Sequence, residues 1–109
     1  MSGYVYLIVE WDKIEKNSYP SKIGVTKGSI ENRIKKLQTG NCSNLHMLNF
    51  FKSEYPFKLE KMLHRHYQPY RNNGEWFTLT EECVVNFNKT CQEKENIINL
   101  LLNENPFYK

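Results

Sequence analysis

The sequence lacks long apolar runs and closely spaced cysteines, and each absence excludes a class of protein. No apolar run is long enough to cross a membrane, and the N-terminus has no charged stretch followed by an apolar one, so we expect neither a membrane span nor a secretory signal. The cysteines Cys42, Cys83 and Cys91 are odd in number and lack the C-x₂₋₄-C spacing of zinc sites. We therefore expect reduced thiols in a cytoplasmic protein.

Internal repeats, low-complexity segments and a strong excess of one charge are also missing. A chain of 109 residues is long enough for one domain with a modest core. Its net charge of +3 is too small to indicate a polyanionic partner by itself. Function therefore has to be argued from local motifs and their order.

The spacing of apolar residues predicts an α+β domain with an antiparallel sheet. Strands are predicted at residues 4–9, 22–26, 45–52 and 75–79, of which the third should be largely buried. Helices are predicted at about 30–39, 57–67 and 81–103, with Ser29 and Thr80 as N-caps of the first and last. Residues 1–79 would form the main module, and residues 80–109 a C-terminal helix that packs on it and ends at Asn105-Pro106.

The stretch 21–33 combines a short strand with the start of a basic helix. Ile23 and Val25 share one side of the strand and can face a core, so Lys22 points away from that core. At about 100° per residue, Arg33 falls roughly 60° from the first apolar residue of the helix, at the margin of its apolar stripe. Arg33 can therefore lean over the strand that precedes it.

Two further elements carry candidate polar side chains. Tyr6 belongs to a predicted strand of aromatic and aliphatic residues, and successive side chains of this strand point to opposite faces. We expect Tyr6 on the exposed face, beside Lys22. Glu60 and His64 are i, i+4 neighbours on the flank of the helix predicted at 57–67. These positions are compatible with a shared polar site.

Three other polar residues are more typical of structural roles. His66 lies on the apolar stripe of its helix and His46 lies on a strand, so we expect both to be core histidines. Glu75 precedes two aromatic residues, Trp76 and Phe77, and is expected to bond to a backbone turn.

Taken in order, these motifs resemble those of the GIY-YIG endonuclease superfamily. Tyr4-Val5-Tyr6 stands at the first motif, Lys22-Ile23-Gly24 at the second, Arg33 on the following helix, and Glu60 on a later helix. The Lys-Ile-Gly segment, the Leu-Glu helix with a trailing His and the Glu-Trp-Phe strand are similar to a phage and viral branch of that superfamily. The chain departs from the family pattern where Lys22 replaces a Tyr and where Leu37 stands in place of a His.

The resemblance, which covers residues 3–79, implies a small three-stranded antiparallel sheet flanked by helices, with residues 75–79 as a short extra strand. It also implies a metal-dependent endonuclease that hydrolyses phosphodiester bonds in DNA, with RNA as an alternative substrate. If the protein comes from a phage or virus, its place would be the cytoplasm of the host cell.

The resemblance further assigns a role to each candidate residue. Glu60 would hold one Mg²⁺ or Mn²⁺ that binds the scissile phosphate. Arg33 would stabilise the transition state, and Tyr6 would take or relay the proton of the attacking water, with Lys22 lowering its pKa. His64 could bind the metal, relay protons or merely cap the packing of its helix. The nucleic-acid backbone would be contacted by Lys27, Lys35 and Lys36.

Two other functions use the same sequence. A nucleic-acid-binding or regulatory protein that does not cut would use the basic residues around Arg33 as a phosphate-contacting patch. A protein-interaction adaptor would use the aromatic surface. Near the end of the last helix, the apolar arc at 97–102 is wide enough for both the core and a partner chain, so a homodimer and a purely intramolecular packing are both open.

Overall fold

The computed structural model describes residues 2–40 and 44–104. Its strands are β1 (Gly3–Glu10), β2 (Tyr19–Thr26), β3 (Leu45–Ser53), β4 (Arg71–Asn73) and β5 (Trp76–Leu79). Its helices are α1 (Ile30–Thr39), α2 (Pro56–His66), α3 (Glu81–Val85) and α4 (Phe87–Glu104), with 3₁₀ turns at Trp11–Lys13 and Gln68–Tyr70. The predictions for Cys42 and for a helix end at Asn105-Pro106 lie outside the described residues.

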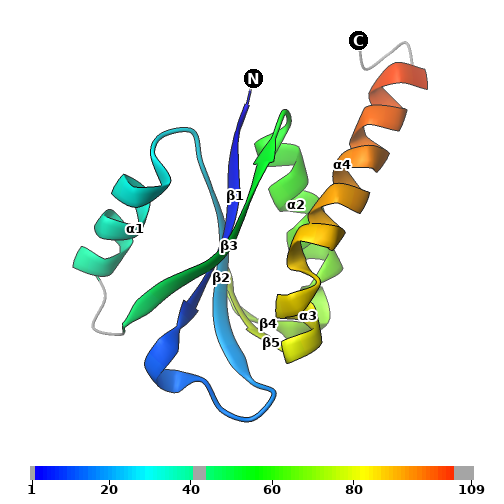
Figure 1. The fold of residues 1–109 in the computed structure, drawn as a ribbon. Coiled ribbons are helices and arrows are strands. Elements are labelled where there is room, and N and C mark those ends of the chain that lie inside the picture. Colours follow the sequence, from blue (N-terminus) through cyan, green and yellow to red (C-terminus); the bar gives the residue numbers. More distant parts are fainter. Residues whose placement is uncertain (1, 41–43, 105–109) are drawn as a thin grey trace.

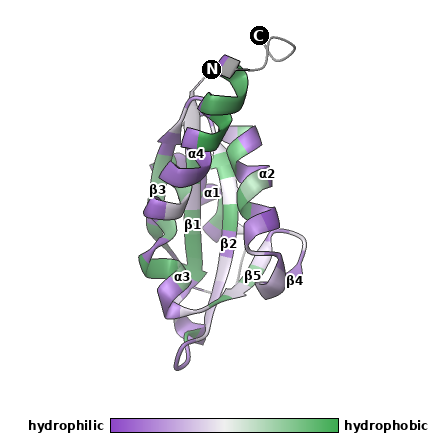
Figure 2. Cartoon of the chain, turned by 90° about the vertical axis from the view of Figure 1, so that its right-hand side faces the viewer, coloured by the Kyte–Doolittle hydropathy of each residue, from purple (hydrophilic) through white to green (hydrophobic). Residues whose placement is uncertain are grey.

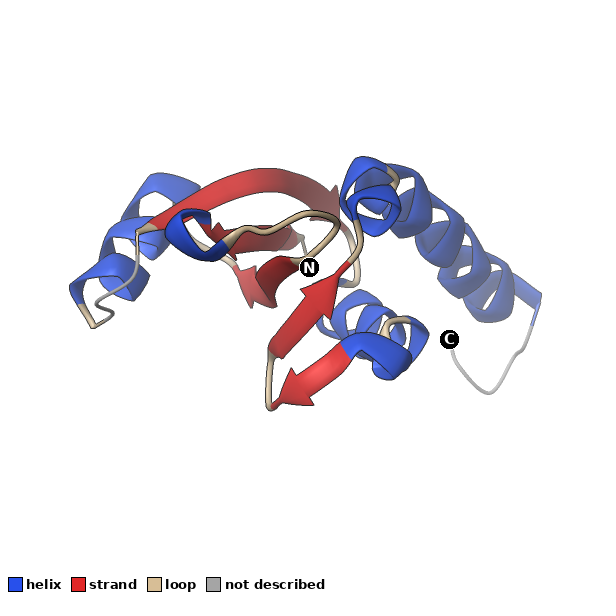
Figure 3. Cartoon of the chain, turned by 90° about the horizontal axis from the view of Figure 1, so that it is seen from below, coloured by secondary structure: helices blue, strands red, loops and turns tan. Residues whose placement is uncertain are grey.

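The strands form one antiparallel sheet in the order β3-β1-β2-β5-β4. The α+β class and the antiparallel sheet are confirmed, but the sheet has five strands instead of three with one addition. The strand that the sequence did not predict is β4, whose three polar residues have little strand propensity of their own. It forms because Gly74, at φ 58°, turns the chain so that Arg71 pairs with Phe77. Figure 3 shows β4 and β5 as a short hairpin at the lower side of the view.

Helices cover both faces of the sheet (Figure 1). On one face, Val5, Leu7 and Ile23 pack against α2 and α4 in the larger core. On the other face, Tyr6 and Ile8 pack against α1 in a smaller core that also contains Leu45, Ile34, Leu37, Met47 and Trp76. The prediction of an exposed Tyr6 was therefore wrong, because α1 covers the face on which its side chain lies.

The strand β3 is more exposed than the sequence predicted. It pairs with β1 alone and forms one edge of the sheet. Only Leu45 and Ser53 among its residues are buried. The predictions of core positions for His46, on this strand, and for His66, on α2, were also wrong, since both are exposed. His46 lies against the ring of Trp11 instead, with 4.9 Å between the ring centroids.

The helix predicted at 81–103 is divided at Asn86. Thr80 begins α3 as predicted, because its Oγ1 accepts a hydrogen bond from the backbone N–H of Cys83 at 3.2 Å. At Asn86 the backbone lies outside helical geometry, with φ −93° and ψ 9°. The carbonyl of Val84 accepts a hydrogen bond from the side-chain amide of Asn49 on β3, at 3.4 Å. The helix is thus interrupted where its backbone is hydrogen-bonded to the sheet.

A buried carboxylate joins α4 to the turn between β3 and α2. Glu95 accepts hydrogen bonds from Ser53 Oγ at 2.7 Å and from the backbone N–H of Glu54 at 3.0 Å. Ser53 Oγ in turn accepts from the backbone N–H of Tyr55 at 2.9 Å. These bonds satisfy donors that would otherwise be orphaned just before the start of α2. The apolar stripe of α4 is interrupted at Glu95 because that side chain anchors α2.

Beyond Glu95, α4 leaves apolar side chains at the surface. Ile97, Leu100 and Leu101 are exposed, whereas Ile98 packs in the larger core. Figure 2 shows the hydrophobic colour along the C-terminal part of α4. A homodimer through this face stays a prediction. None of the helices in the described part of the chain is both long enough and apolar enough to span a membrane.

We predict that Glu95→Ala lowers the free energy of unfolding by about 1–3 kcal/mol, because two buried donors lose their acceptor. Chemical denaturation followed by circular dichroism measures this change. The matched control is Glu93→Ala, since Glu93 is exposed on the same helix and its loss should cost less than about 0.5 kcal/mol. Equal losses from both substitutions would contradict the anchoring role of Glu95.

Candidate active site

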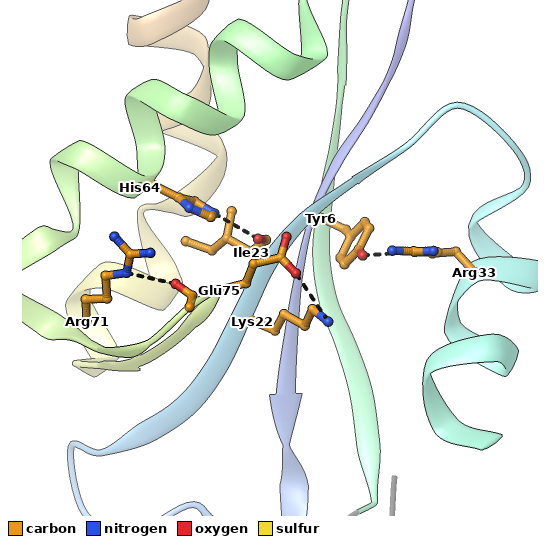
Figure 4. Close-up of polar contacts among 8 residues, drawn as sticks. Tyr6, Lys22, Ile23, Arg33, His64, Arg71 and Glu75 are labelled. Carbon is orange, nitrogen blue, oxygen red and sulfur yellow. Dashed lines mark hydrogen bonds and ion pairs between the residues drawn. The ribbon is translucent and has the colours of Figure 1, made fainter. Parts of the chain in front are cut away.

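One edge of β2 is left without a neighbouring strand over half of its length. β5 pairs with β2 from Tyr19 to Lys22, and within the described ranges no strand continues this pairing along residues 23–26. The free edge lies between the two layers of helices. Figure 4 shows side chains from α1, α2 and the β4–β5 turn meeting around it.

Tyr6 reaches this region by lying over the neighbouring strand at Gly24. The two residues are partners in the register of β1 and β2. A Cβ atom added to residue 24 would overlap Oη of Tyr6 and lie 2.6 Å from its Cζ. Only a residue without a side chain therefore leaves space for the phenol above β2. This close approach gives the glycine of the Lys-Ile-Gly segment a structural explanation.

The hydroxyl group of Tyr6 is held by Arg33 of α1. Arg33 Nε donates a hydrogen bond to Tyr6 Oη at 3.1 Å. The helix begins as predicted, since Ser29 Oγ accepts a hydrogen bond from the backbone N–H of Asn32 at 3.2 Å. Ile34, next to Arg33, packs in the smaller core and docks the helix on the sheet. Arg33 was expected to lean over the strand that precedes its helix, and its observed contact is with Tyr6 of β1, whose hydroxyl lies over that strand at Gly24.

α2 presents Glu60 and His64 to the free edge of β2. His64 Nε2 lies 3.0 Å from the carbonyl oxygen of Ile23, the first residue of β2 beyond its pairing with β5. The backbone N–H of Ile23 donates to the carbonyl of Glu75 at 3.4 Å. Because a carbonyl oxygen only accepts, Nε2 carries the proton in this bond. The ring of His64 also packs edge-on against Phe77, with centroids 5.2 Å apart. Glu60, one turn earlier, is half-buried.

The turn between β4 and β5 adds Glu75, which the sequence interpretation assigned to a structural role. Arg71 Nε donates to the carbonyl of Gly74 at 2.8 Å and so fixes the turn. Glu75 Oε2 lies 3.4 Å from Lys22 Nζ. Potential ligand atoms of Glu60, His64 and Glu75 lie within 4.8 Å of one another, so these three residues could hold a metal ion. The only signal for Glu75 was an acidic residue in the Glu-Trp-Phe segment.

Protonation at the site reflects burial and the pair of carboxyl groups. Burial raises the pKa of Glu60 and the neighbouring Glu75 raises it further, while His64 and Arg33 act in the opposite direction. Burial also raises the pKa of Tyr6, and the hydrogen bond from Arg33 offsets this only in part. The phenol therefore keeps its proton at neutral pH.

The role expected of Lys22 toward Tyr6 has to be corrected. Lys22 pairs with Glu75 and lies near the ring of Trp76, with Nζ 5.8 Å from the ring centroid. The cation beside the phenol is Arg33, and the pKa of Tyr6 is raised, not lowered. Lys22 and Glu75 stand side by side because β5 begins at Trp76, the partner of Lys22.

The three lysines predicted to contact nucleic acid differ in position. Lys36 and Arg33 line a polar hollow of about 250 Å³ at the start of α1, together with Thr26, Gly28, Ser29 and Asn32. Lys27 Nζ lies over the ring of Phe57, 5.1 Å from its centroid. Lys35 is exposed, and the helical repeat places it about 160° around the axis from Arg33. Lys36 is thus the lysine that shares a surface with Arg33.

The structure gathers the five predicted catalytic residues into one connected group. Arg33 contacts Tyr6, and the charges of Glu60 and Glu75 act on both of them. The group is completed by residues that contact Glu75 or lie beside it, namely Lys22 and His64.

Comparison with protein families matches residues 3–95 to the T5orf172 domain. The chain belongs to the T5orf172 domain family. This family is phage-associated and related to GIY-YIG and HNH-type nucleases. No curated protein and no solved structure matches the chain. The T5orf172 match includes every residue of the group around Tyr6 and extends into the first half of α4.

We predict that Gly24→Ala destabilises the fold by about 1–3 kcal/mol, because the new methyl group occupies the space of the Tyr6 hydroxyl. The change is measured as a shift in the denaturation midpoint. Gly40→Ala is the control, since a Cβ there meets no atom within 4 Å. A Gly24→Ala protein as stable as the Gly40→Ala protein would show that Tyr6 does not need its place over β2.

Proposed function

We propose that this T5orf172-family chain is a metal-dependent endonuclease that hydrolyses phosphodiester bonds in DNA. The observation that supports this most strongly is the hydrogen bond from Arg33 to Tyr6 across 27 residues of sequence. It brings a cation and a phenol into the electrostatic range of the Glu60 carboxyl group. These are the groups that phosphodiester hydrolysis needs for charge stabilisation, proton transfer and metal binding.

The reaction adds one water molecule across a P–O bond. The oxygen of water bonds to phosphorus, the departing oxygen takes up one proton, and the other proton is released to solvent. Negative charge grows on the phosphoryl oxygens, where a guanidinium group stabilises it. Arg33 uses Nε for Tyr6, which leaves its two terminal nitrogens to bind phosphoryl oxygens as a fork.

Tyr6 acts in this proposal as a proton relay. Its hydroxyl oxygen accepts from Arg33 and keeps its own proton for donation. The side chain has no exposed surface, so the groups that cover its hydroxyl, the Arg33 guanidinium among them, would have to move before the hydroxyl meets the attacking water. Arg33 would thus couple phosphate binding to the exposure of Tyr6.

Glu60 would bind Mg²⁺ or Mn²⁺, since carboxylate oxygens are ligands that both ions accept. The site suits a divalent cation because the half-buried Glu60 and the exposed Glu75 bring two carboxyl groups close together. When bound, the ion would polarise the scissile phosphate and stabilise the charge of the transition state.

The hollow beside Arg33 would hold the phosphate backbone of the substrate. Lys36 lines it together with Arg33, and Lys27 and Lys35 would add longer-range attraction to the same polyanion. Contacts of this kind position a nucleic acid without reading its sequence.

A second candidate function is a nucleic-acid-binding protein that does not cut. The complete burial of Tyr6 favours it, because a hydroxyl without exposed surface cannot reach a substrate unless Arg33 moves. The two functions share the hollow and differ in the need for Glu60 and Tyr6.

We predict that Glu60→Ala abolishes cleavage and leaves DNA affinity unchanged, because affinity depends mainly on Lys and Arg contacts with phosphates. Nicking of supercoiled plasmid in Mg²⁺ or Mn²⁺ measures cleavage, with a chelator as control, and gel shifts measure affinity. In the same assay, Tyr6→Phe should slow nicking by about 10²–10⁴-fold. Tight binding without chelator-sensitive nicking, on DNA and on RNA, would favour the protein that does not cut.

We predict that Lys36→Ala weakens DNA binding and lowers the salt dependence of the binding constant by about one released ion, since one phosphate contact is lost. Lys35→Ala, which removes the same charge about 160° around α1 from Arg33, should change both quantities less, because Lys35 does not line the hollow. Fluorescence anisotropy over a series of salt concentrations gives both numbers. A larger effect of Lys35→Ala would place the nucleic acid on another face of α1.

A further inference from the structure

We infer that Glu60, His64 and Glu75 together form a three-ligand site for a divalent transition-metal ion, with a nitrogen ligand that selects against Mg²⁺. This deepens the proposed function, which needs only Glu60 as a metal ligand. The inference rests on the placement of the three side chains and on the hydrogen bond that fixes the imidazole.

The three ligands come from two elements that are brought together by the fold. Glu60 and His64 lie one turn apart on α2, and Glu75 lies in the turn before β5. Their potential ligand atoms are within 4.8 Å of one another. Ligands at about 2.0–2.2 Å from a zinc-sized ion are at most about 4.4 Å apart. Small rotations of the side chains are therefore enough to close the site around an ion.

The hydrogen bond of His64 prepares its ring for a metal. Nε2 donates to the carbonyl oxygen of Ile23 at 3.0 Å, so the neutral ring carries its lone pair on Nδ1. Histidines that bind metals commonly donate their second nitrogen to a backbone carbonyl in this way, which sets the tautomer and the ring orientation. The free edge of β2 is what offers the carbonyl of Ile23 to His64.

The charges around the site leave room for a cation. Lys22 contacts Oε2 of Glu75, so Oε1 of the same carboxylate can serve as a ligand without breaking the ion pair. Potential ligand atoms of Glu60 and Glu75 lie within 4.8 Å of each other, so the two carboxylates repel when both are ionised. A divalent ion between them removes this repulsion.

The ligand set determines which metals bind. Mg²⁺ prefers oxygen ligands and retains most of its waters, whereas an imidazole nitrogen favours Mn²⁺ and, more strongly, Co²⁺ and Zn²⁺. The expected order of affinity is therefore Zn²⁺ and Co²⁺ above Mn²⁺, and Mn²⁺ above Mg²⁺.

The test measures binding of metal ions alone to the full chain, by calorimetry for Co²⁺, Mn²⁺ and Mg²⁺. His64→Ala and Glu75→Gln should each weaken Co²⁺ and Mn²⁺ binding by at least about tenfold. The matched control is His66→Ala, because His66 is exposed two residues further along α2 and should leave binding unchanged. Far-ultraviolet circular dichroism confirms that each variant is folded.

A second measurement identifies the nitrogen ligand directly. Substoichiometric Mn²⁺ should broaden the imidazole resonances of His64 in nuclear magnetic resonance spectra before those of His46 or His66. Equal affinity for Mg²⁺ and Co²⁺, or Co²⁺ binding that survives both substitutions, would overturn the three-ligand site.

The inference and the proposed function can fail separately. Co²⁺ binding that depends on His64 and Glu75, without any nicking of DNA or RNA, would support the metal site and reject the nuclease. Nicking that depends on Glu60 but is unchanged by His64→Ala and Glu75→Gln would support the nuclease and reject the three-ligand site.

Discussion

The close approach of Tyr6 to Gly24 is the constraint on which the candidate site depends. A side chain at residue 24 would take the place of the phenol, so the ring could not lie over β2. With the ring in place, its hydroxyl meets Arg33, and the packing of α1 over the same face buries it completely. The absence of a side chain at Gly24 thus allows a contact that links β1, β2 and α1, three elements that are also joined by apolar packing and backbone pairing.

The length of β5 is the second constraint, because it decides how much of β2 remains unpaired. Unpaired strand edges tend to associate with other chains, so proteins cover them or interrupt them. Here the four-residue strand β5 covers the first half of β2, and α2 approaches the rest, with His64 bonded to the carbonyl of Ile23. A longer β5 would pair with that carbonyl and separate α2 from the Tyr6 side of the sheet. The part of β2 beyond β5 is therefore covered by α2 and still contributes a backbone carbonyl to the candidate site.

Local sequence signals predicted the parts of this fold that depend on local interactions. The N-caps Ser29 and Thr80 were found because each cap is a contact within one turn of helix. The burial of Tyr6, the strand β4 and the interruption at Asn86 could not be found in this way, since each depends on an element distant in sequence. Glu95 is the clearest case, because the two groups that donate hydrogen bonds to it, on Ser53 and Glu54, come before α2 in the sequence, whereas Glu95 comes after it.

The same distinction between local and long-range interactions applies to the site residues. Tyr6, Arg33 and Glu60 could be proposed from the order of motifs, but the order of motifs does not indicate which cation pairs with which polar group. Register decides this: Lys22 is the partner of Trp76, so the residue before Trp76 meets the lysine and not the phenol. A tyrosine at position 22, as in the GIY-YIG pattern, would leave Glu75 without this cation. The lysine of the second motif and the glutamate before β5 are therefore best understood as one pair, in which Lys22 balances part of the negative charge that Glu75 adds beside Glu60.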